Sequence, residues 1–290
     1  MYGTLIIAYL FLGGAAGGSF LVMALWSLAF HQRHPHRSDE LRGAFRSLKS
    51  IVYPLSTIVL AVALSCLLWD LEHPRRMMLI FLLPHPTVLT FGAASLALLL
   101  LIGLLLSLAN LFHLRILGGR IKAALELLCV PVAALAMGYT GVFLYSNLGV
   151  PLWHTLTLIG LFFFSALSSG LSVIMLVDYL AQGQTRSLNA LRPLQRWHLA
   201  CLLLEGAFLV AFCLSAWLNP SAALAIETLL APNVLSTALV GAVGFGIVIP
   251  FLLESYTLLR KEQRAIPVSD FLCLIGAFCL RWSVIVCGVH

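Results

Sequence analysis

The sequence predicts an all-α fold, a polytopic membrane protein with about eight transmembrane helices, and its composition is the first reason. Of the 290 residues, 61% are hydrophobic and only 10% are charged, and the mean hydropathy is +1.02. A soluble domain carries about a quarter charged residues, because its surface must meet water. The longest polar segment, His31 to Ser50, is too short to bury a core of its own. We therefore expect a single integral membrane domain over residues 1–290.

The second reason is the length of the apolar stretches. A helix needs about twenty mainly apolar residues to cross the hydrocarbon core, and backbone groups in lipid must be satisfied within the segment. The first stretch lacks a preceding basic segment and is too long for a signal-peptide core, so we expect it to be the first span. The predicted helices cover residues 4–30, 51–70, 87–112, 123–146, 152–180, 197–219, 233–258 and 268–289.

The basic residues predict the orientation of these helices. Fourteen of the 17 Lys and Arg residues fall in alternate connections, on one side of the membrane, whereas only Arg75 and Arg76 lie in connections on the other side. Cytoplasmic loops carry the excess of Lys and Arg, which predicts that both termini lie outside the cytoplasm. The net charge of +6 is spread over short loops, a pattern that does not indicate nucleic-acid binding.

Cysteine and histidine spacing argues against a metal centre held by this chain. The 7 cysteines lie singly in apolar runs, without the paired spacing of an iron–sulfur cluster or a structural zinc site. A membrane haem b needs two histidines at similar depth, and no clear mid-membrane pair exists. Only His113 with His198, both at the inner edge, stays open as a haem pair. We therefore expect no haem, no cluster and no metal site.

Ionisable groups within the spans fall into two sets, and such groups usually mark functional sites. The outer set contains Asp70, Tyr139 and Arg281, with His73 and Arg75 in the connection after Asp70. The deeper set consists of Asp178, Glu205 and Glu254. Ion pairs with neighbouring cations are the favoured interpretation for two of these: Asp178 with Arg186, and Glu254 with Arg260 or Lys261. Glu205 has no basic neighbour nearby in its segment, so a structural hydrogen bond and proton movement remain equal alternatives.

Small residues form faces on two of the spans. The first span contains Gly13-Gly14-Ala15-Ala16-Gly17-Gly18-Ser19, and the fifth presents Ser165, Ser168, Ser169 and Ser172. Small faces let helix backbones approach closely in lipid, so helix packing is the favoured interpretation. A quinone lying against the glycine face is the alternative.

Short motifs in order along the whole chain resemble the NrfD/PsrC-like membrane subunits of bacterial respiratory complexes, of the polysulfide reductase type. Each motif is weak alone, but eight in the right order with the right number of helices form a strong resemblance. They are Ala8-Tyr9-Leu10-Phe11-Leu12-Gly13-Gly14 with Gly17-Gly18, Trp69-Asp70-Leu71-Glu72-His73-Pro74-Arg75-Arg76, Leu83-Pro84-His85-Pro86-Thr87, Gly138-Tyr139-Thr140-Gly141, Phe164-Ser165-Ala166-Leu167-Ser168-Ser169-Gly170, Glu205-Gly206, Ile249-Pro250 and Leu280-Arg281-Trp282.

The resemblance implies two four-helix bundles in the bacterial inner membrane, with both termini extracytoplasmic. It implies an exchangeable quinone, menaquinone or ubiquinone, bound near the outer surface by a subunit that holds no cofactor of its own. It also implies partners on that surface: a ferredoxin-like iron–sulfur subunit, together with a molybdopterin catalytic subunit or a multihaem cytochrome. The chain would then exchange electrons between the quinone pool and the iron–sulfur subunit.

The resemblance also suggests which residues act in quinol oxidation. Tyr139 and Asp70 are expected near the quinone head, with His73 as a further acid–base candidate and Arg75 or Arg281 tuning the carboxylate. The opening helix has no asparagine or histidine to bond a quinone carbonyl, only Tyr9 and Ser19. The expected quinone contacts are Tyr9, Gly13, Gly14, Gly17, Arg75, Thr140 and Arg281, and the expected proton route uses Glu205, Asp178 and Glu254.

Two other functions are compatible with the sequence. A secondary transporter would use Glu205 and the glycine-rich run 241–246 as a substrate path through a broken helix, although no internal repeat supports it. A plain membrane anchor for a soluble partner would have no redox role.

Overall fold

The computed structural model describes residues 3–33, 39–70, 87–112, 119–147, 149–182, 188–260 and 268–288. Within these ranges, 8 helical segments are long and apolar enough to cross a membrane, which confirms the predicted all-α membrane fold. Seven are single α-helices: α1 (Thr4–Arg33), α2 (Asp39–Asp70), α4 (Val88–Leu111), α5 (Gly119–Tyr145), α6 (Leu156–Gln182), α7 (Leu188–Leu218) and α11 (Val268–Gly288). The seventh crossing along the chain combines α9 (Pro232–Ser236), η3 (Thr237–Val248) and α10 (Ile249–Arg260).

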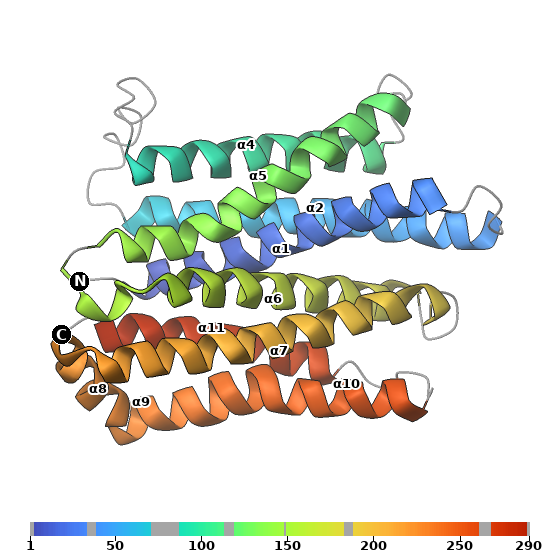
Figure 1. Ribbon diagram of the computed structural model, residues 1–290. Coiled ribbons are helices and arrows are strands. Elements are labelled where there is room, and N and C mark those ends of the chain that lie inside the picture. Colours follow the sequence, from blue (N-terminus) through green and yellow to red (C-terminus); the bar gives the residue numbers. More distant parts are fainter. Residues whose placement is uncertain are drawn as a thin grey trace.

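The helices form two bundles that lie side by side (Figure 1). The first contains α1, α2, α4 and α5, and the second contains α6, α7, the seventh crossing and α11. Two short 3₁₀ turns, η1 (Pro151–Trp153) and η2 (Pro220–Ala222), and the helix α8 (Ala223–Leu230) lie at the end where α1 begins and α11 ends. We call this end the terminal end. The opposite end, where α1 ends and α2 begins, is called the basic end.

The two bundles meet along α1 and α6, where two glycines touch. A Cβ atom at Gly18 would collide with the backbone of α6, and one at Gly170 would collide with the backbone of α1. The Ser19 hydroxyl lies 2.8 Å from its own helix carbonyl at Ala15 and 3.4 Å from the carbonyl oxygen of Gly170. Such close approach is possible only for small residues, which supports the packing interpretation of the glycine face of the first span.

Two helices begin earlier than the apolar stretches predict. The helix α2 starts at Asp39 rather than at residue 51, and α7 starts at Leu188 rather than at residue 197. Charged residues lower the hydropathy of these first turns, but they do not interrupt a helix. At 32 residues, α2 is about 48 Å long, which exceeds the hydrocarbon thickness of about 30 Å.

The seventh crossing stays helical through its glycine-rich run. Residues Thr237–Val248 form a π-helix. This form is rare in proteins overall, but where it occurs it is often at a functional site. Gly246 packs on Gly276 of α11, and Gly241 faces Cys279 of the same helix. The glycines that suggested a broken helix therefore serve close packing of the seventh crossing on α11.

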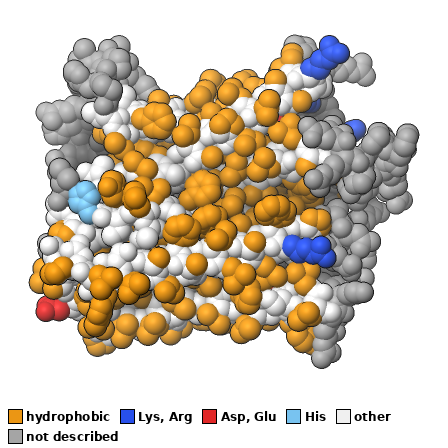
Figure 2. Space-filling model, in the orientation of Figure 1, with side chains coloured by type: hydrophobic (Ala, Val, Ile, Leu, Met, Phe, Trp, Pro, Cys, Tyr) orange, Lys and Arg blue, Asp and Glu red, His pale blue; other side chains and the backbone are white. Residues whose placement is uncertain are grey.

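The surface of the molecule is that of a protein surrounded by lipid. Hydrophobic side chains cover the middle of the view in Figure 2, and the Lys and Arg side chains visible there lie toward the basic end. Exposed side chains include Leu259, Trp217 and Val210, at 83%, 72% and 69%. The polar and charged side chains therefore lie mainly inside the bundles and at their ends.

Candidate functional site

A pocket of about 670 Å³ opens between α4 and α5 in the first bundle, near the terminal end. Its volume falls in the range of small-molecule sites, and its lining is mainly apolar with a few hydroxyl groups, as such sites usually are. The polar side chains of the lining are those of Thr87, Thr90 and Tyr139. The remaining lining residues are Val88, Phe91, Ala94, Ala134, Leu135, Gly138 and Val142.

The Tyr139 side chain is held by a glycine on the facing helix. Its ring lies where a Cβ atom at Gly92 of α4 would be, so any other residue at position 92 would displace the ring. Tyr139 is 7% exposed, and its ring centroid lies 5.9 Å from that of Phe143. Gly92 thus fixes the position of the one aromatic hydroxyl-bearing side chain in the pocket lining. Sequence analysis identified Tyr139 but not Gly92, because the requirement for glycine arises from a contact between helices.

A second phenol lies near the first. Tyr9 of α1 is 3% exposed, and no described residue hydrogen-bonds its hydroxyl oxygen. It interacts electrostatically with Tyr139, and its ring is 3.6 Å from the position that a Cβ atom at Gly13 would take. A buried tyrosine hydroxyl usually has a hydrogen-bond partner. Tyr9 lies near Tyr139 but, unlike Tyr139, does not line the pocket.

The other residues predicted for the outer site are dispersed. Asp70 ends α2 beside Gly3, at the terminal end but outside the pocket lining. The Thr140 hydroxyl donates to the Met137 carbonyl oxygen at 2.8 Å and does not line the pocket. His73 and Arg75 lie outside the described residues.

The glycines of α1 face protein rather than the pocket. Gly14 faces Arg281 and Ala166, and Gly17 faces Met137. None of Gly13, Gly14 and Gly17 lines the pocket. These contacts favour helix packing over quinone contact for this part of the first helix.

Arg281 joins three helices in the interior. It is 1% exposed and donates to the Leu10 carbonyl oxygen of α1 at 3.1 Å, to Ser165 Oγ of α6 at 3.1 Å and to the Ala277 carbonyl oxygen at 2.8 Å. Its charged neighbour is Glu205. The expectation that Arg281 tunes Asp70 is therefore replaced by a partnership with Glu205.

Glu205 lies in a polar environment that its own helix does not reveal. Its carboxylate lies next to the hydroxyls of Ser165 and Ser168 and near the charges of Arg281 and His198. It is 3% exposed, and no described residue hydrogen-bonds its Oε2 atom. Sequence analysis found no nearby cation because Arg281 comes from α11.

His198 of α7 is the centre of this buried array. Its Nδ1 atom is 2.7 Å from Glu254 Oε1 of α10. Its Nε2 atom is 3.3 Å from the hydroxyls of both Ser168 and Ser172, and 3.6 Å from Cys273 Sγ. Glu254 therefore pairs with His198, whereas its predicted partners, Lys261 and the side chain of Arg260, lie outside the described residues. The i, i+7 spacing of His198 and Glu205 places both on one face of α7, a signal that the sequence analysis missed.

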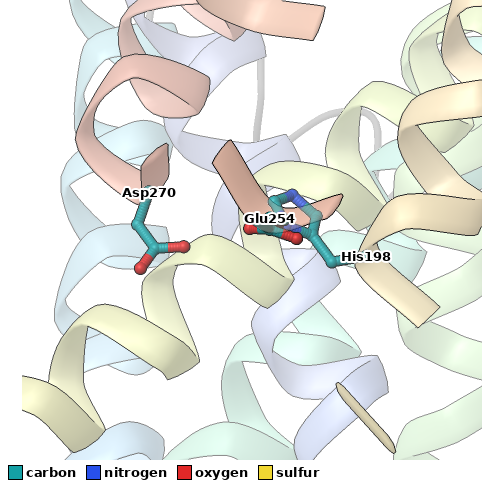
Figure 3. A group of neighbouring side chains, drawn as sticks. All are labelled: His198, Glu254 and Asp270. Carbon is teal, nitrogen blue, oxygen red and sulfur yellow. Dashed lines mark hydrogen bonds and ion pairs between the residues drawn. The ribbon is translucent and has the colours of Figure 1, made fainter. Parts of the chain in front are cut away.

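Asp270 of α11 completes the cluster at the basic end (Figure 3). Ligating atoms of His198, Glu254 and Asp270 lie within 4.8 Å of one another, and all three residues are buried. These residue types bind metals elsewhere, but here Nδ1 is at hydrogen-bond distance from Glu254 while Nε2 faces hydroxyls. This geometry fits a hydrogen-bonded cluster. Asp178 is also buried, on the same helix as Ser172, and its predicted partner Arg186 lies outside the described residues.

The first bundle contains a buried ion pair that the sequence analysis did not identify. Lys49 of α2 pairs with Glu126 of α5 and donates to Ser27 Oγ at 2.7 Å. Ser27 donates to Glu126 Oε2 at 2.7 Å, and Tyr53 lies 3.3 Å from Glu126 Oε1. Lys49 was assigned to a basic connection because the apolar stretch begins only after it. Both carboxylate oxygens of Glu126 thus have donors.

Comparison with known proteins agrees with this architecture. Curated proteins give no significant match to the chain. The sequence profile of the family described as "Polysulphide reductase, NrfD" matches residues 1–290, the whole chain. This match confirms the resemblance seen in the ordered motifs. With eight apolar helical segments among the described residues and a family profile that covers its full length, the chain belongs to the NrfD family of membrane proteins.

Proposed function

We propose that this chain is the membrane anchor and quinol/quinone-binding subunit of a respiratory oxidoreductase complex. It would exchange electrons between the quinone pool and an extracytoplasmic iron–sulfur subunit. The observation that carries this proposal is the apolar pocket that contains Tyr139. The pocket lies between two helices with lipid-facing side chains, since Phe91 of α4 is 56% exposed and Leu135 of α5 is 47% exposed. A quinone dissolved in the bilayer would enter sideways between α4 and α5.

The residues of the pocket suit the chemistry of a quinol. Oxidation removes two protons and two electrons, so the two ring oxygens need hydrogen-bond partners and an acid–base group nearby. Tyr139 would bond one oxygen, and Tyr9, which lies near Tyr139 but outside the pocket lining, is the second candidate donor. Asp70 at the terminal end, or His73, would accept a proton and pass it to water, and Arg75 would tune the carboxylate. Menaquinone or ubiquinone would serve as the exchangeable substrate.

The terminal end is the proposed docking surface for partners. The chain's cysteines are all single and free, so electrons leaving the quinol need acceptors on another subunit. A ferredoxin-like iron–sulfur subunit would receive them and pass them to a molybdopterin subunit or a multihaem cytochrome. The distribution of Lys and Arg supports the bacterial inner membrane with the basic end in the cytoplasm and both termini outside. Glu205, Asp178 and Glu254 would then lie on a proton route from the cytoplasm.

The test is quinol oxidation by the complex purified in mild detergent, with and without Tyr139→Phe. Loss of the hydroxyl is expected to lower kcat/KM at least about tenfold, because the phenol hydrogen-bonds the reacting oxygen. Tyr145→Phe is the matched control on the same helix, because the Tyr145 ring packs on His154 outside the pocket lining. Unchanged turnover in Tyr139→Phe would remove Tyr139 from the site. Purification of a chain without partners and without quinol oxidation would favour a transporter, and an assembled but redox-inactive complex would favour a plain anchor.

A further inference from the structure

We propose that His198 is a two-sided proton relay that connects the carboxylates of Glu254 and Glu205 through the second bundle. The proposal rests on the proposed quinol-linked function and adds to it the residues that would carry protons. Three of them, His198, Asp270 and Ser168, were not part of the predicted proton route. The relay rests on a chain of contacts inside the second bundle, from Glu254 to His198, from His198 to Ser168 and from Ser168 to Glu205.

The entry to the relay lies at the basic end. Asp270 is in the first turn of α11, and Glu254 is on α10 shortly before that helix ends. Both are buried, at 0% and 1% exposed, and a carboxylate oxygen of each lies within 4.8 Å of a ring nitrogen of His198 (Figure 3). Carboxylates at this depth are costly in a membrane protein and usually face a path for ions or protons. This pair would collect protons from the cytoplasmic side.

The exit from His198 is on the opposite side of its ring. Nε2 faces the hydroxyls of Ser168 and Ser172, each at 3.3 Å, and Ser168 lies next to the Glu205 carboxylate. A serine hydroxyl is both donor and acceptor, so it can pass a proton between the ring and the carboxylate. The imidazole is suited to its role because one ring nitrogen can accept a proton while the other releases one.

The array ends at the boundary with the first bundle. Glu205 lies next to Ser165, which accepts a hydrogen bond from Arg281, and Arg281 donates to the Leu10 carbonyl oxygen of α1. Leu10 directly follows Tyr9, whose orphaned hydroxyl lies near Tyr139. A change of charge at Glu205 is therefore linked by Arg281 to the helix that contributes to the proposed quinone site.

The transfer itself balances in protons. Protonated Glu254 gives its proton to Nδ1 of His198, which becomes an imidazolium, and the imidazolium loses its Nε2 proton through Ser168 to Glu205. The net change is one proton moved from the Glu254 carboxyl group to the Glu205 carboxylate. Return of the ring to its first tautomer prepares it for the next proton.

The ionisable groups that face the two ends of the relay come from several helices. Glu254 of α10 and Cys273 of α11 contact His198, and Asp270 lies in the same cluster. Around Glu205 they are His198, Cys201 of its own helix and Arg281 of α11. Arg281 is the permanent positive charge of the set. A proton arriving at Glu205 would therefore weaken the attraction between Glu205 and Arg281. Because Arg281 also donates to the Leu10 carbonyl oxygen, this change would be felt by α1.

The experiment measures two rates in the same proteoliposomes containing the whole complex: quinol oxidation, and proton uptake from the side facing the basic end. The readout is the number of protons taken up per quinol oxidised, which a purely structural defect in the quinone site would not change. His198→Gln and Glu254→Gln are expected to lower this ratio at least about tenfold. His154→Gln is the matched control, because His154 packs on Tyr145 outside the relay.

Each outcome has a defined meaning. An unchanged ratio in His198→Gln overturns the relay, and so does wild-type quinol oxidation without uptake from the basic end, which leaves the proposed quinol function standing. Absence of quinol oxidation in the wild type overturns the proposed function itself. If His198→Gln does not assemble, Ser168→Ala decides: a lowered ratio supports the relay, and an unchanged ratio overturns it.

Discussion

The two bundles bury ionisable groups at their basic ends in opposite ways. In the first, Lys49 and Glu126 form an ion pair, and Ser27 and Tyr53 complete the donors to the carboxylate. In the second, His198 meets two carboxylates and two serine hydroxyls, and deeper in the bundle Glu205 keeps one oxygen that no described residue bonds. Each carboxylate oxygen of the ion pair already has a donor, whereas the second cluster holds an imidazole that can accept a proton at one nitrogen and release one at the other. The comparison therefore separates a structural cluster from one that is equipped to move protons.

The largest expected effect comes from breaking the ion pair of the first bundle. Lys49→Met leaves the Glu126 carboxylate buried without its cation, which is expected to cost about 3–5 kcal/mol of stability. Thermal unfolding of the purified complex in detergent would measure it. The double variant Lys49→Met/Glu126→Gln removes both charges and is expected to recover most of the loss. Equal stability of Lys49→Met and wild type would show that the pair is not structural.

The next largest effect is expected in the second bundle, on the number of protons taken up per quinol oxidised. Glu205→Gln keeps the size of the side chain but removes the proton-accepting carboxylate, so protons taken up per quinol are expected to fall about tenfold. Stability is expected to fall as well, because the buried Arg281 loses its charged neighbour, so the comparison is made on the ratio of protons to quinol. Proton uptake in liposomes decides the matter, and equal uptake by variant and wild type would exclude Glu205 from the route.

A third prediction concerns the pocket of the first bundle, between α4 and α5. Gly92→Ala places a methyl group where the Tyr139 ring now lies, so quinol oxidation is expected to fall about fivefold as the hydroxyl is displaced. The double variant Gly92→Ala/Tyr139→Phe is expected to be no worse than Tyr139→Phe alone, because residues in contact are not additive. Additive losses in this cycle would mean that Gly92 acts on something other than Tyr139.

The smallest expected effect lies within the relay. Ser172 and Ser168 approach the same nitrogen of His198, but only Ser168 is also next to Glu205. Ser172→Ala is therefore expected to lower stability by about 1 kcal/mol and to leave protons per quinol within about twofold of wild type. A loss as large as that of Ser168→Ala would show that the proton passes through Ser172.

The sequence predicts the membrane helices well and the contacts between them poorly. Hydropathy locates each span because lipid demands a long apolar segment, and it fails at the start of α2, where a helix continues beyond the membrane. Tyr139 was expected at an outer site, and the pocket includes it. The partners of Glu205 and Glu254 were not predictable from nearby residues, because Arg281 and His198 reach them from other helices.

His198 shows what sequence patterns can and cannot give. Its i, i+7 spacing from Glu205 predicts a shared helix face, but not what that face meets. Pairing with Glu254 depends on which face of α10 is turned toward α7. The π-helix Thr237–Val248 before α10 changes that rotation, and hydropathy does not predict it. The need for glycine at position 92 is missed for a similar reason, since it arises from the Tyr139 ring on α5, which leaves no room for a side chain there.

The contact between Gly18 and Gly170 has a mechanical consequence. Because backbone meets backbone there, no flexible side chain lies between α1 and α6 to absorb a displacement. A shift of α1 at the proposed quinone site would therefore be transmitted to α6 as the motion of a rigid body, and α6 carries Ser165, Ser168 and Ser172. Quinol oxidation at the terminal end would then be coupled mechanically to the positions of the three serine hydroxyls of α6 in the second bundle.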